Sequence, residues 1–406
     1  MAIFKDHTVS AKHLLGYIPE ALIANLSLTT KIDHYAKVLH GNKLFYLLLY
    51  GILDNEKLSQ RTLEDTFNDS VFKVLFNLDG DERIRRSSIS ERLSKIDPNY
   101  FQQIYECIYD QFSSLYSIRE RDKYNLIRVD SSMVSETVGK LIEGLDNKSG
   151  KRAVKYSIAF DGILPCNSSV FTSKSYASED IALPEAVMAH VKKEIGHQNI
   201  YVMDRGLQST KTMKEFTSSK VIFICRCKEN KKFVQLESLM SERQELDLGE
   251  SVLLNDCKVQ LYTGAQIKSK QDNKHFIRQE LVDTPFRLII AESKLDGKKY
   301  WFLTNDFGLS AKEIAQAYRR RWDIEVFFRF LKQELNVSHL VSLNKNGIQV
   351  MLYMTLIVAM LVLIYKKANQ IGYKTAKRRF SMEIRDLAIA LIVVQCGGDP
   401  GLFFKT

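Results

Sequence analysis

The segment from Ser310 to about Leu335 constrains the fold more than any other part of the chain. It reads SAKEIAQAYRRRWDIEVFFRFLKQEL, and Ser310 with Glu313 forms a capping box, which predicts that a helix begins here. Bulky apolar residues occupy most of the helix circumference, namely Trp322, Val326, Phe327, Phe330 and Leu331. The sequence therefore predicts one long helix that is largely buried.

Four polar residues of this helix form a single stripe. Tyr318, Arg321, Glu325 and Lys332 follow one another at spacings of 3, 4 and 7 residues. At roughly 100° per residue they fall within about 60° of one face. Charges on a buried helix need partners, and a polyanion with a divalent metal would supply them. A solvated amphipathic helix with an Arg–Glu pair is the alternative.

Two aspartates follow short apolar runs that are typical of buried strands. Asp130 comes after Leu-Ile-Arg-Val, and Asp204 comes after Ile-Tyr-Val-Met. Because ligand sites lie where the strands of such sheets end, these side chains and Glu325 could form a three-carboxylate cluster. Such clusters bind Mg²⁺ or Mn²⁺, which prefer oxygen ligands. A lone aspartate at either place more often caps a helix or forms a turn.

Asp323 competes with Glu325 as the acidic ligand of the helix. It is predicted to face away from the stripe, because two residues correspond to about 200° of rotation. Glu325 is therefore the preferred candidate. Asp161, Glu179 and Asp180 could surround the site, although nothing in the sequence singles them out.

These motifs resemble those of a known family. The spacing Y-x2-R-x3-E-x6-K is similar to that of DDE transposases of bacterial insertion sequences, in particular the fourth insertion-sequence family, of the cut-and-paste type. Asn125-Leu-Ile-Arg-Val-Asp130-Ser-Ser resembles the strand of the family's first aspartate. Ile200-Tyr-Val-Met-Asp204-Arg-Gly-Leu resembles that of the second, with its usual Asp-Arg-Gly. The resemblance covers roughly residues 30 to 365.

The resemblance implies roles for eight residues. The catalytic residues, which also hold the Mg²⁺ (or Mn²⁺), would be Asp130, Asp204 and Glu325. The DNA-binding residues would be Tyr318, Arg321, Lys332, Arg226 and Trp301. In the family the tyrosine and first arginine steady the backbone beside a flipped base, the lysine contacts terminal nucleotides, and a tryptophan stacks with the displaced base. Without the resemblance, an arginine in a strand is usually a surface residue, and a tryptophan at position 301 is more often part of the hydrophobic core.

The implied function is transposition. The protein would bind the inverted-repeat ends of its element, cleave DNA there by Mg²⁺-dependent phosphoryl transfer through hairpin ends, and join the 3′ ends to target DNA. Water attacks first and a DNA 3′-hydroxyl second, so no side-chain nucleophile is required. Synapsis of two ends implies a homodimer on double-stranded DNA. The net charge of +10 suits a polyanionic partner.

The order of elements predicts an α/β fold. From residue 125 it is β-β-β-α-β-α-β, which is that of a ribonuclease H-like fold, and short alternating stretches then predict a β-rich insertion. We expect an N-terminal helical DNA-binding region over 1–118, a catalytic core over 119–227 and 300–345, the insertion over 228–299, and a C-terminal helical region over 346–406. The first region carries a basic cluster that suits either DNA binding or a solvated face: Arg83, Arg85, Arg86, Arg92 and Lys95.

One apolar segment raises the question of a membrane. Ile348 to Tyr365 is a run of 18 uncharged residues, which is the lower limit for a transmembrane helix. It contains Gln349 and Thr355, and the sequence has no second such run. The N-terminus also lacks the apolar core of a signal peptide. We therefore expect a buried helix in a cytoplasmic, nucleoid-associated protein.

Three other functions compete with transposition. A ribonuclease H-like, structure-specific DNA nuclease such as a junction resolvase would usually be much smaller and would lack the Tyr-Arg-Glu-Lys stripe. A catalytically inactive protein that only occupies transposon ends would not need the intact acidic triad. A membrane-associated protein built on residues 348–365 conflicts with the single span and the basic surroundings.

Overall fold

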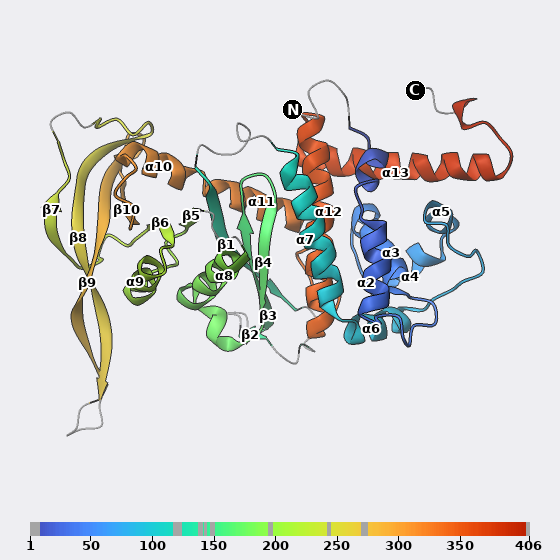
Figure 1. Cartoon of the computed structure of the whole chain (residues 1–406), viewed down its shortest axis with the longest axis horizontal. Coiled ribbons are helices and arrows are strands. Elements are labelled where there is room, and N and C mark those ends of the chain that lie inside the picture. The colour runs from blue at the N-terminus through green and yellow to red at the C-terminus, as the bar shows by residue number, and fades with distance from the viewer. Residues whose placement is uncertain are drawn as a thin grey trace.

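The molecule has a helical end, a central sheet and a projecting ribbon (Figure 1). The computed structural model describes residues 9–116, 124–136, 141, 144–146, 151–193, 198–241, 245–268 and 275–402. The N-terminal helices are α1 (Ala11–Leu15), α2 (Glu20–Thr29), α3 (Gly41–Asp54), α4 (Gln60–Asn68), α5 (Ser70–Leu75), α6 (Arg86–Lys95) and α7 (Pro98–Ser114).

All ten strands that the structure describes belong to one sheet. They are β1 (Leu126–Ser135), β2 (Leu145–Asp146), β3 (Arg152–Phe160), β4 (Pro165–Phe171), β5 (Ile200–Met203), β6 (Ile222–Arg226), β7 (Phe233–Ser238), β8 (Ser251–Lys268), β9 (His275–Ser293) and β10 (Lys299–Thr304). Their order is β2-β3-β1-β5-β6-β10-β9-β8-β7, and β4 pairs with β3. The pairs β1–β5 and β5–β6 are parallel, whereas β1–β3 is antiparallel. The predicted mixed α/β class is confirmed.

Helices cover both faces of the central strands. Buried residues of α8 (Glu179–Lys193) and α9 (Thr210–Ser218) form a core with one face. Residues of α10 (Ala311–Arg319) and α11 (Trp322–Glu334) pack on the other. Because β5 and the middle of β6 are buried on both faces, they are continuously apolar, as is typical of parallel strands.

The predicted single helix over 310–335 is two helices. The capping box at Ser310 and Glu313 is present, but α10 ends at Arg319 and α11 begins at Trp322. At the junction the amides of Arg321 and Asp323 donate to carbonyls three residues back, as in a 3₁₀ turn. The Arg320 carbonyl also accepts from the Arg128 side chain on β1, at 3.3 Å. A side chain that enters the helical ladder is a recognised cause of such breaks.

The apolar segment near the C-terminus forms the centre of the helical end. Helix α12 (Lys345–Ala368) packs against α3, α6, α7 and α13 (Tyr373–Gln395). Among the described residues it alone is long and apolar enough to cross a membrane, and 89% of its most apolar window is buried inside the protein. The prediction that residues 348–365 are buried is confirmed. The N-terminal and C-terminal helices share one hydrophobic core.

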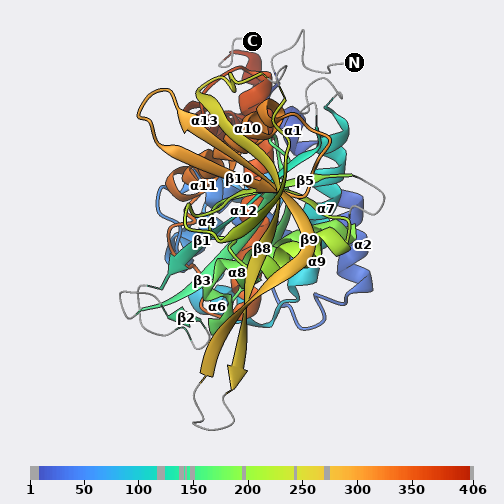
Figure 2. The same ribbon diagram turned by 90° about the vertical axis from the view of Figure 1, so that its left-hand side faces the viewer.

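Residues 228–299 contribute strands β7, β8 and β9. Figures 1 and 2 show that β8 and β9 form a ribbon whose far end extends beyond the rest of the molecule. Inside the sheet, Arg287 of β9 donates to Asp256 of β8 at 2.9 and 2.7 Å, and both side chains are buried. The β-rich character of this segment agrees with the sequence. Its interpretation as an insertion that splits a catalytic core remains a prediction.

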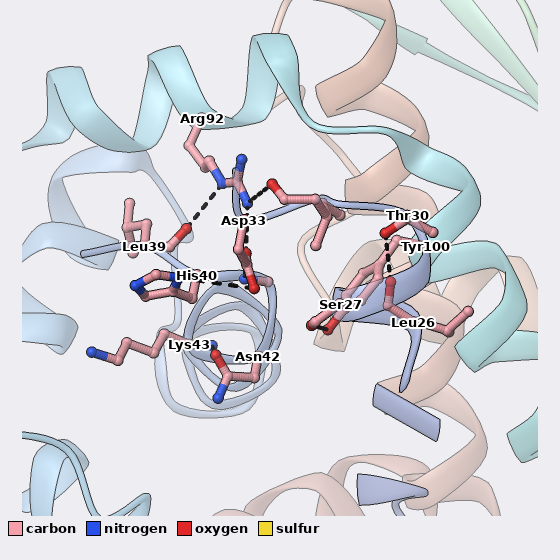
Figure 3. Close-up of polar contacts among 12 residues, drawn as sticks. Leu26, Ser27, Thr30, Asp33, Leu39, His40, Asn42, Lys43, Arg92 and Tyr100 are labelled. Carbon is pink, nitrogen blue, oxygen red and sulfur yellow. Dashed lines mark hydrogen bonds and ion pairs between the residues drawn. The ribbon is translucent and has the colours of Figure 1, made fainter. Parts of the chain in front are cut away.

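One residue of the predicted basic cluster has a structural role. Figure 3 shows Arg92 of α6 pointing into the segment that joins α2 to α3. Its guanidinium donates to the Leu39 carbonyl at 2.9 Å, the Ile32 carbonyl at 2.8 Å and Asp33 at 3.1 Å. Asp33 also accepts from the Gly41 amide, at the start of α3. Arg92 is therefore committed to the fold, which corrects its grouping with the exposed arginines Arg83, Arg85 and Arg86.

Candidate active site

The two predicted aspartates lie side by side. In the parallel register of β1 and β5, Val129 pairs with Met203, so Asp130 and Asp204 are the next residues on neighbouring strands. Asp204 follows the end of β5, as predicted. Asp130 lies in the middle of β1 and not at its end, because β1 continues to Ser135 by pairing with β3. The two carboxylates are still close enough for the charge of Asp204 to act on Asp130.

The Asp130 carboxyl is strongly affected by its surroundings. Burial is the main cause that raises the pKa of Asp130 to about 7, and the charges of Asp204 and Glu179 act in the same direction. The Ser131 amide, which donates to Asp130 at 2.7 Å, and the nearby charge of Arg321 act in the opposite direction. Two carboxylates in a partly dry site repel each other, and this repulsion favours a cation between them.

Arg321 connects the glutamate of the stripe to these aspartates. Its Nη2 donates to Glu325 Oε1 at 2.5 Å, and both side chains are largely buried. Burial lowers the pKa of Arg321, but Tyr318, Glu325 and Asp130 together raise it above the ordinary value. Arg321 thus lies within the field of both Glu325 and Asp130.

The structure does not gather the three predicted acids into one cage. Within the described part of the chain, no three His, Cys, Asp or Glu side chains are close enough to hold a metal ion. Asp130 and Asp204 are hard oxygen donors at one place and fit a divalent cation. Glu325 fits the same chemistry, but here it is engaged by Arg321.

Tyr318 and Arg226 lie together on the α10 side of the sheet. Burial raises the pKa of Tyr318 to about 12, and the charges of Arg321 and Arg226 oppose this shift. The Arg226 guanidinium stacks 4.5 Å from the centre of the Tyr300 ring. These residues line a hollow of about 690 Å³ together with Phe302, Arg319 and Glu250. A hollow with aromatic walls and arginine side chains can hold a flat group beside a phosphate.

Trp301 and Lys332 do not join this group. Trp301 alternates with Tyr300 along β10, and it packs on the other face of the sheet, edge-on to Phe233 at 5.8 Å. This placement disfavours the predicted contact with a displaced base. Lys332 is exposed two turns beyond Glu325 on α11, where it can reach only a ligand that extends along the helix.

Asp323 and Trp322, the other two notable residues of α11, lie outside the predicted site. Asp323 faces away from the stripe, as predicted, and accepts from the buried Arg128 at 3.0 Å. Trp322 was predicted to be buried, but 52% of its surface is exposed. It lies at the first position of α11, where Arg329 stacks on it at 5.9 Å.

The sequence offered Glu179 as a possible neighbour of the site without singling it out, and Lys155 was not selected. Glu179 lies at the start of α8 and accepts from the buried Lys155 of β3 at 2.8 Å. The lysine in a mostly apolar strand, Ala-Val-Lys-Tyr-Ser-Ile, was the available signal. A charge at such a position requires a buried partner.

A family model described as "Transposase DDE domain" matches residues 121–361, which is more than half of the chain. The chain belongs to the DDE transposase family. These transposases as a family depend on divalent metal ions. The match includes every residue of the site described above.

Two similar proteins are named as insertion-sequence transposases. A putative transposase for insertion sequence element IS4SA from Synechocystis sp. is 25% identical over 351 residues, which are 86% of this transposase and 87% of that protein. A probable transposase for insertion sequence element IS5377 from Geobacillus stearothermophilus is 28% identical over 165 residues, 41% and 39% of the two chains. Among solved structures, a piggyBac transposase synaptic complex with hairpin DNA matches with a TM-score of 0.46 at 12% identity, over 100% of this transposase and 81% of that chain.

Proposed function

We propose that this transposase binds the inverted-repeat ends of its own element, cleaves the DNA there by Mg²⁺-dependent phosphoryl transfer and joins the 3′ ends to target DNA. The observation that carries the proposal is the adjacency of Asp130 and Asp204 beside the Arg321–Glu325 pair, in a chain of the DDE family. Hairpin ends as an intermediate rest on the family resemblance alone.

The catalytic core in this proposal is a ribonuclease H-like unit. The strand order β4-β3-β1-β5-β6 supports it. Strand β3 is antiparallel to both of its neighbours, β1 and β4, whereas β5 and β6 run parallel to β1. Helices α8, α9 and α10–α11 cover its two faces. Strands β7 to β9 would then be the insertion over residues 228–299, and the helices before and after the core would bind DNA.

Asp130, Asp204 and Glu325 would hold the divalent cation. When bound, such cations stabilise the attacking and leaving oxygens of a phosphodiester and lower the pKa of the attacking water. The chain's own contribution is to fix the two aspartates by the β1–β5 register and to exclude water around Asp130 by burial.

In the DNA-free protein, Arg321 would stay paired with Glu325 until a DNA phosphate replaces the carboxylate. Its bond to Glu325 satisfies both charges while no DNA is present. A backbone phosphate offers the guanidinium a bidentate partner. Exchange of Glu325 for phosphate would release the carboxylate toward Asp130 and Asp204. Cation binding by all three acids would then be coupled to DNA binding.

Further DNA contacts follow from the same surface. Tyr318 and Arg226 would contact the DNA from the aromatic hollow, and Lys332 from the exposed part of α11. The DNA would be double-stranded, both at the terminal repeats and at the target, and a homodimer would bring two ends together. The net charge of +10 supports a nucleic-acid partner and a location at the nucleoid in the cytoplasm.

Cleavage of DNA that carries the element's own terminal repeats tests the proposal. Asp204→Ala and Glu325→Gln should reduce end cleavage to background, while end binding in a gel-shift assay stays close to wild type. Near wild-type cleavage by Asp204→Ala would remove it from the site. If the wild-type protein binds the ends but never cleaves them with Mg²⁺ or Mn²⁺, the inactive end-binding alternative, which the engaged state of Glu325 favours, takes precedence.

The salt dependence of end binding tests the stripe. Arg321→Ala and Lys332→Ala should each weaken binding and lower the slope of log K against log [salt] by roughly one ion. Arg321→Lys keeps the charge but loses the bidentate fork, so cleavage should still fall. Lys211→Ala, which changes an exposed lysine of α9, is the control. Unchanged affinity with a large loss of thermal stability for Arg321→Ala would assign Arg321 to folding.

A further inference from the structure

The short loop between β5 and α9 begins with Asp204 and orients its carboxylate. Asp204 Oδ1 accepts from the amide of Gly206 at 2.7 Å, so the direction of the carboxylate depends on the position of that amide. A Cβ atom at residue 206 would lie 2.7 Å from Asp204 Oδ1 and 2.9 Å from Cβ of Glu179. A larger residue would push these side chains apart, so the loop borders the start of α8 closely.

Asp180, the second residue of α8, holds the far end of this loop. Its Oδ1 accepts from the amides of Gln208 at 2.5 Å and Ser209 at 2.7 Å. Hydrogen bonds from amides to an ionised carboxylate are roughly twice as strong as those between neutral groups. Ser209 in turn caps α9, because its hydroxyl accepts from the amide of Thr212 at 3.2 Å. The Asp180 side chain therefore fixes the loop where it joins the next helix.

Lys231 binds the other polar backbone group of Gln208. It lies in the turn between β6 and β7, and its Nζ donates to the Gln208 carbonyl at 2.5 Å. The amide of Gln208 is thus bound by a carboxylate and its carbonyl by an ammonium group. Burial lowers the pKa of Lys231, and the charge of Asp180 is among the influences that oppose this shift. The segment 228–299 therefore supplies a contact to the loop that carries Asp204.

We propose that Asp180 and Lys231 are positioning residues for the reaction, which hold the backbone of Gln208 and thereby fix Asp204 in the orientation that the chemistry requires. This inference rests on the proposed function. Loops are ordinarily more mobile than the elements that they join, and a displacement of about 1 Å at a reacting group can slow a reaction about 100-fold. In this role neither side chain contacts DNA, so its loss should affect cleavage and not end binding.

Amide hydrogen exchange and single-turnover cleavage, both measured on the whole chain, test the inference. In Asp180→Ala, exchange of the Gln208 and Ser209 amides should accelerate at least about tenfold, because both lose a charged acceptor. Cleavage of bound DNA ends should slow by about 10–100-fold, while end binding in a gel-shift assay stays close to wild type. Lys231→Met removes the donor to the Gln208 carbonyl and should change exchange and cleavage in the same direction.

Two further variants separate positioning from a general effect on folding. Asp180→Asn keeps an oxygen that can accept from both amides, so it should restore most of the protection from exchange and most of the cleavage rate. Asp69→Ala is the matched control, because Asp69 accepts from the amide of Val71 at 2.6 Å at the start of α5, in the helical end. It should lower stability and leave the cleavage rate of the folded protein unchanged.

Several outcomes would overturn the inference. Unchanged exchange in Asp180→Ala would do so, as would wild-type cleavage despite faster exchange. An equal loss of cleavage in Asp180→Asn and Asp180→Ala would show that the hydrogen bonds are not the cause. If Asp180→Ala does not fold, wild-type cleavage by Lys231→Met overturns the inference instead. Failure of the proposed function is distinguishable, because the wild-type protein would then not cleave at all, or Asp204→Ala would cleave at the wild-type rate.

Discussion

At the scale of single residues, the Asp130 carboxyl combines burial with a nearby negative charge. Its pKa in the folded protein is about 7 and the ordinary value is 3.8. Between these two pH values, the Asp130 carboxyl of the folded state therefore still binds a proton that the unfolded state has released. Stability attributable to Asp130 is fully present below pH 3.8 and is lost as the pH rises toward 7. In the metal-free protein, this loss of stability arises at the position where a cation is expected to bind.

Asp130→Asn should therefore stabilise the metal-free protein at high pH. The amide carries no charge, so the gain in unfolding free energy over wild type should grow from about pH 4 to pH 7 and then level off. Its upper value is about 4 kcal/mol, from the pKa difference at 1.36 kcal/mol per unit. Thermal melts with EDTA from pH 4.5 to 8 measure it. A pH-independent difference between variant and wild type would contradict the assignment, and added Mg²⁺ should narrow the gap above pH 7.

At the scale of elements, the break between α10 and α11 falls inside the stripe, between Tyr318 and Glu325. The Arg128 guanidinium donates to the carbonyls of Leu126 at 2.8 Å, Asp161 at 3.0 Å and Arg320 at 3.3 Å, and to the Asp323 carboxylate. A strand residue thus fixes the turn that positions Arg321. Gly162 leaves room for this side chain, because a Cβ there would lie 2.7 Å from Arg128 Nη1.

Arg128→Met should cost about 3 kcal/mol of unfolding free energy, because it leaves buried carbonyls and one carboxylate without their donor. Asp323→Asn is the matched control, and its loss should be smaller, since Asp323 is 45% exposed and the amide can still accept. Urea unfolding measures both. Hydrogen exchange of the amides of residues 320–324 should accelerate in Arg128→Met. An unfolding free energy within about 0.5 kcal/mol of wild type would show that Arg128 does not support the turn.

At the scale of the whole molecule, α12 joins the helical end to the sheet. Its buried side chains share one core with the N-terminal helices, with α11 and with the apolar face of β3. It also contacts β4. The predicted helical and catalytic regions therefore depend on a common core, and we expect them to unfold together.

Leu356→Ala tests this connection. Leu356 is fully buried in α12, so its truncation should cost about 2–5 kcal/mol. Far-UV circular dichroism follows mainly the helices, whereas fluorescence follows Trp301 in the sheet and Trp322 on α11. Both signals should shift to the same lower urea midpoint. Leu391→Ala, on the exposed part of α13, should have little effect. A fluorescence midpoint that stays at the wild-type value would mean that the sheet unfolds independently.

The sequence by itself determined the local features of this transposase. The capping box at Ser310, the bounds of β5 and the burial of residues 348–365 follow from short-range hydrogen bonding and hydrophobic patterning. The sequence also predicted that Asp130 and Asp204 lie close together, although it placed both at strand ends and β1 continues past Asp130. Asp323 faced away from the stripe as the helical period required.

Only the tertiary structure decided the contacts between distant segments. Arg128 donates to the carbonyl at the break between α10 and α11 from 192 residues away, a contact that no propensity of residues 310–335 could indicate. The face of β10 on which Trp301 packs depends on the strand register with β6 and β9, and the burial of Arg92 depends on the α2–α3 segment. Lys155 and Glu179 meet across 24 residues. Sequence patterns encode which faces are apolar. Which buried charges pair with each other is decided only when the tertiary structure brings distant segments together.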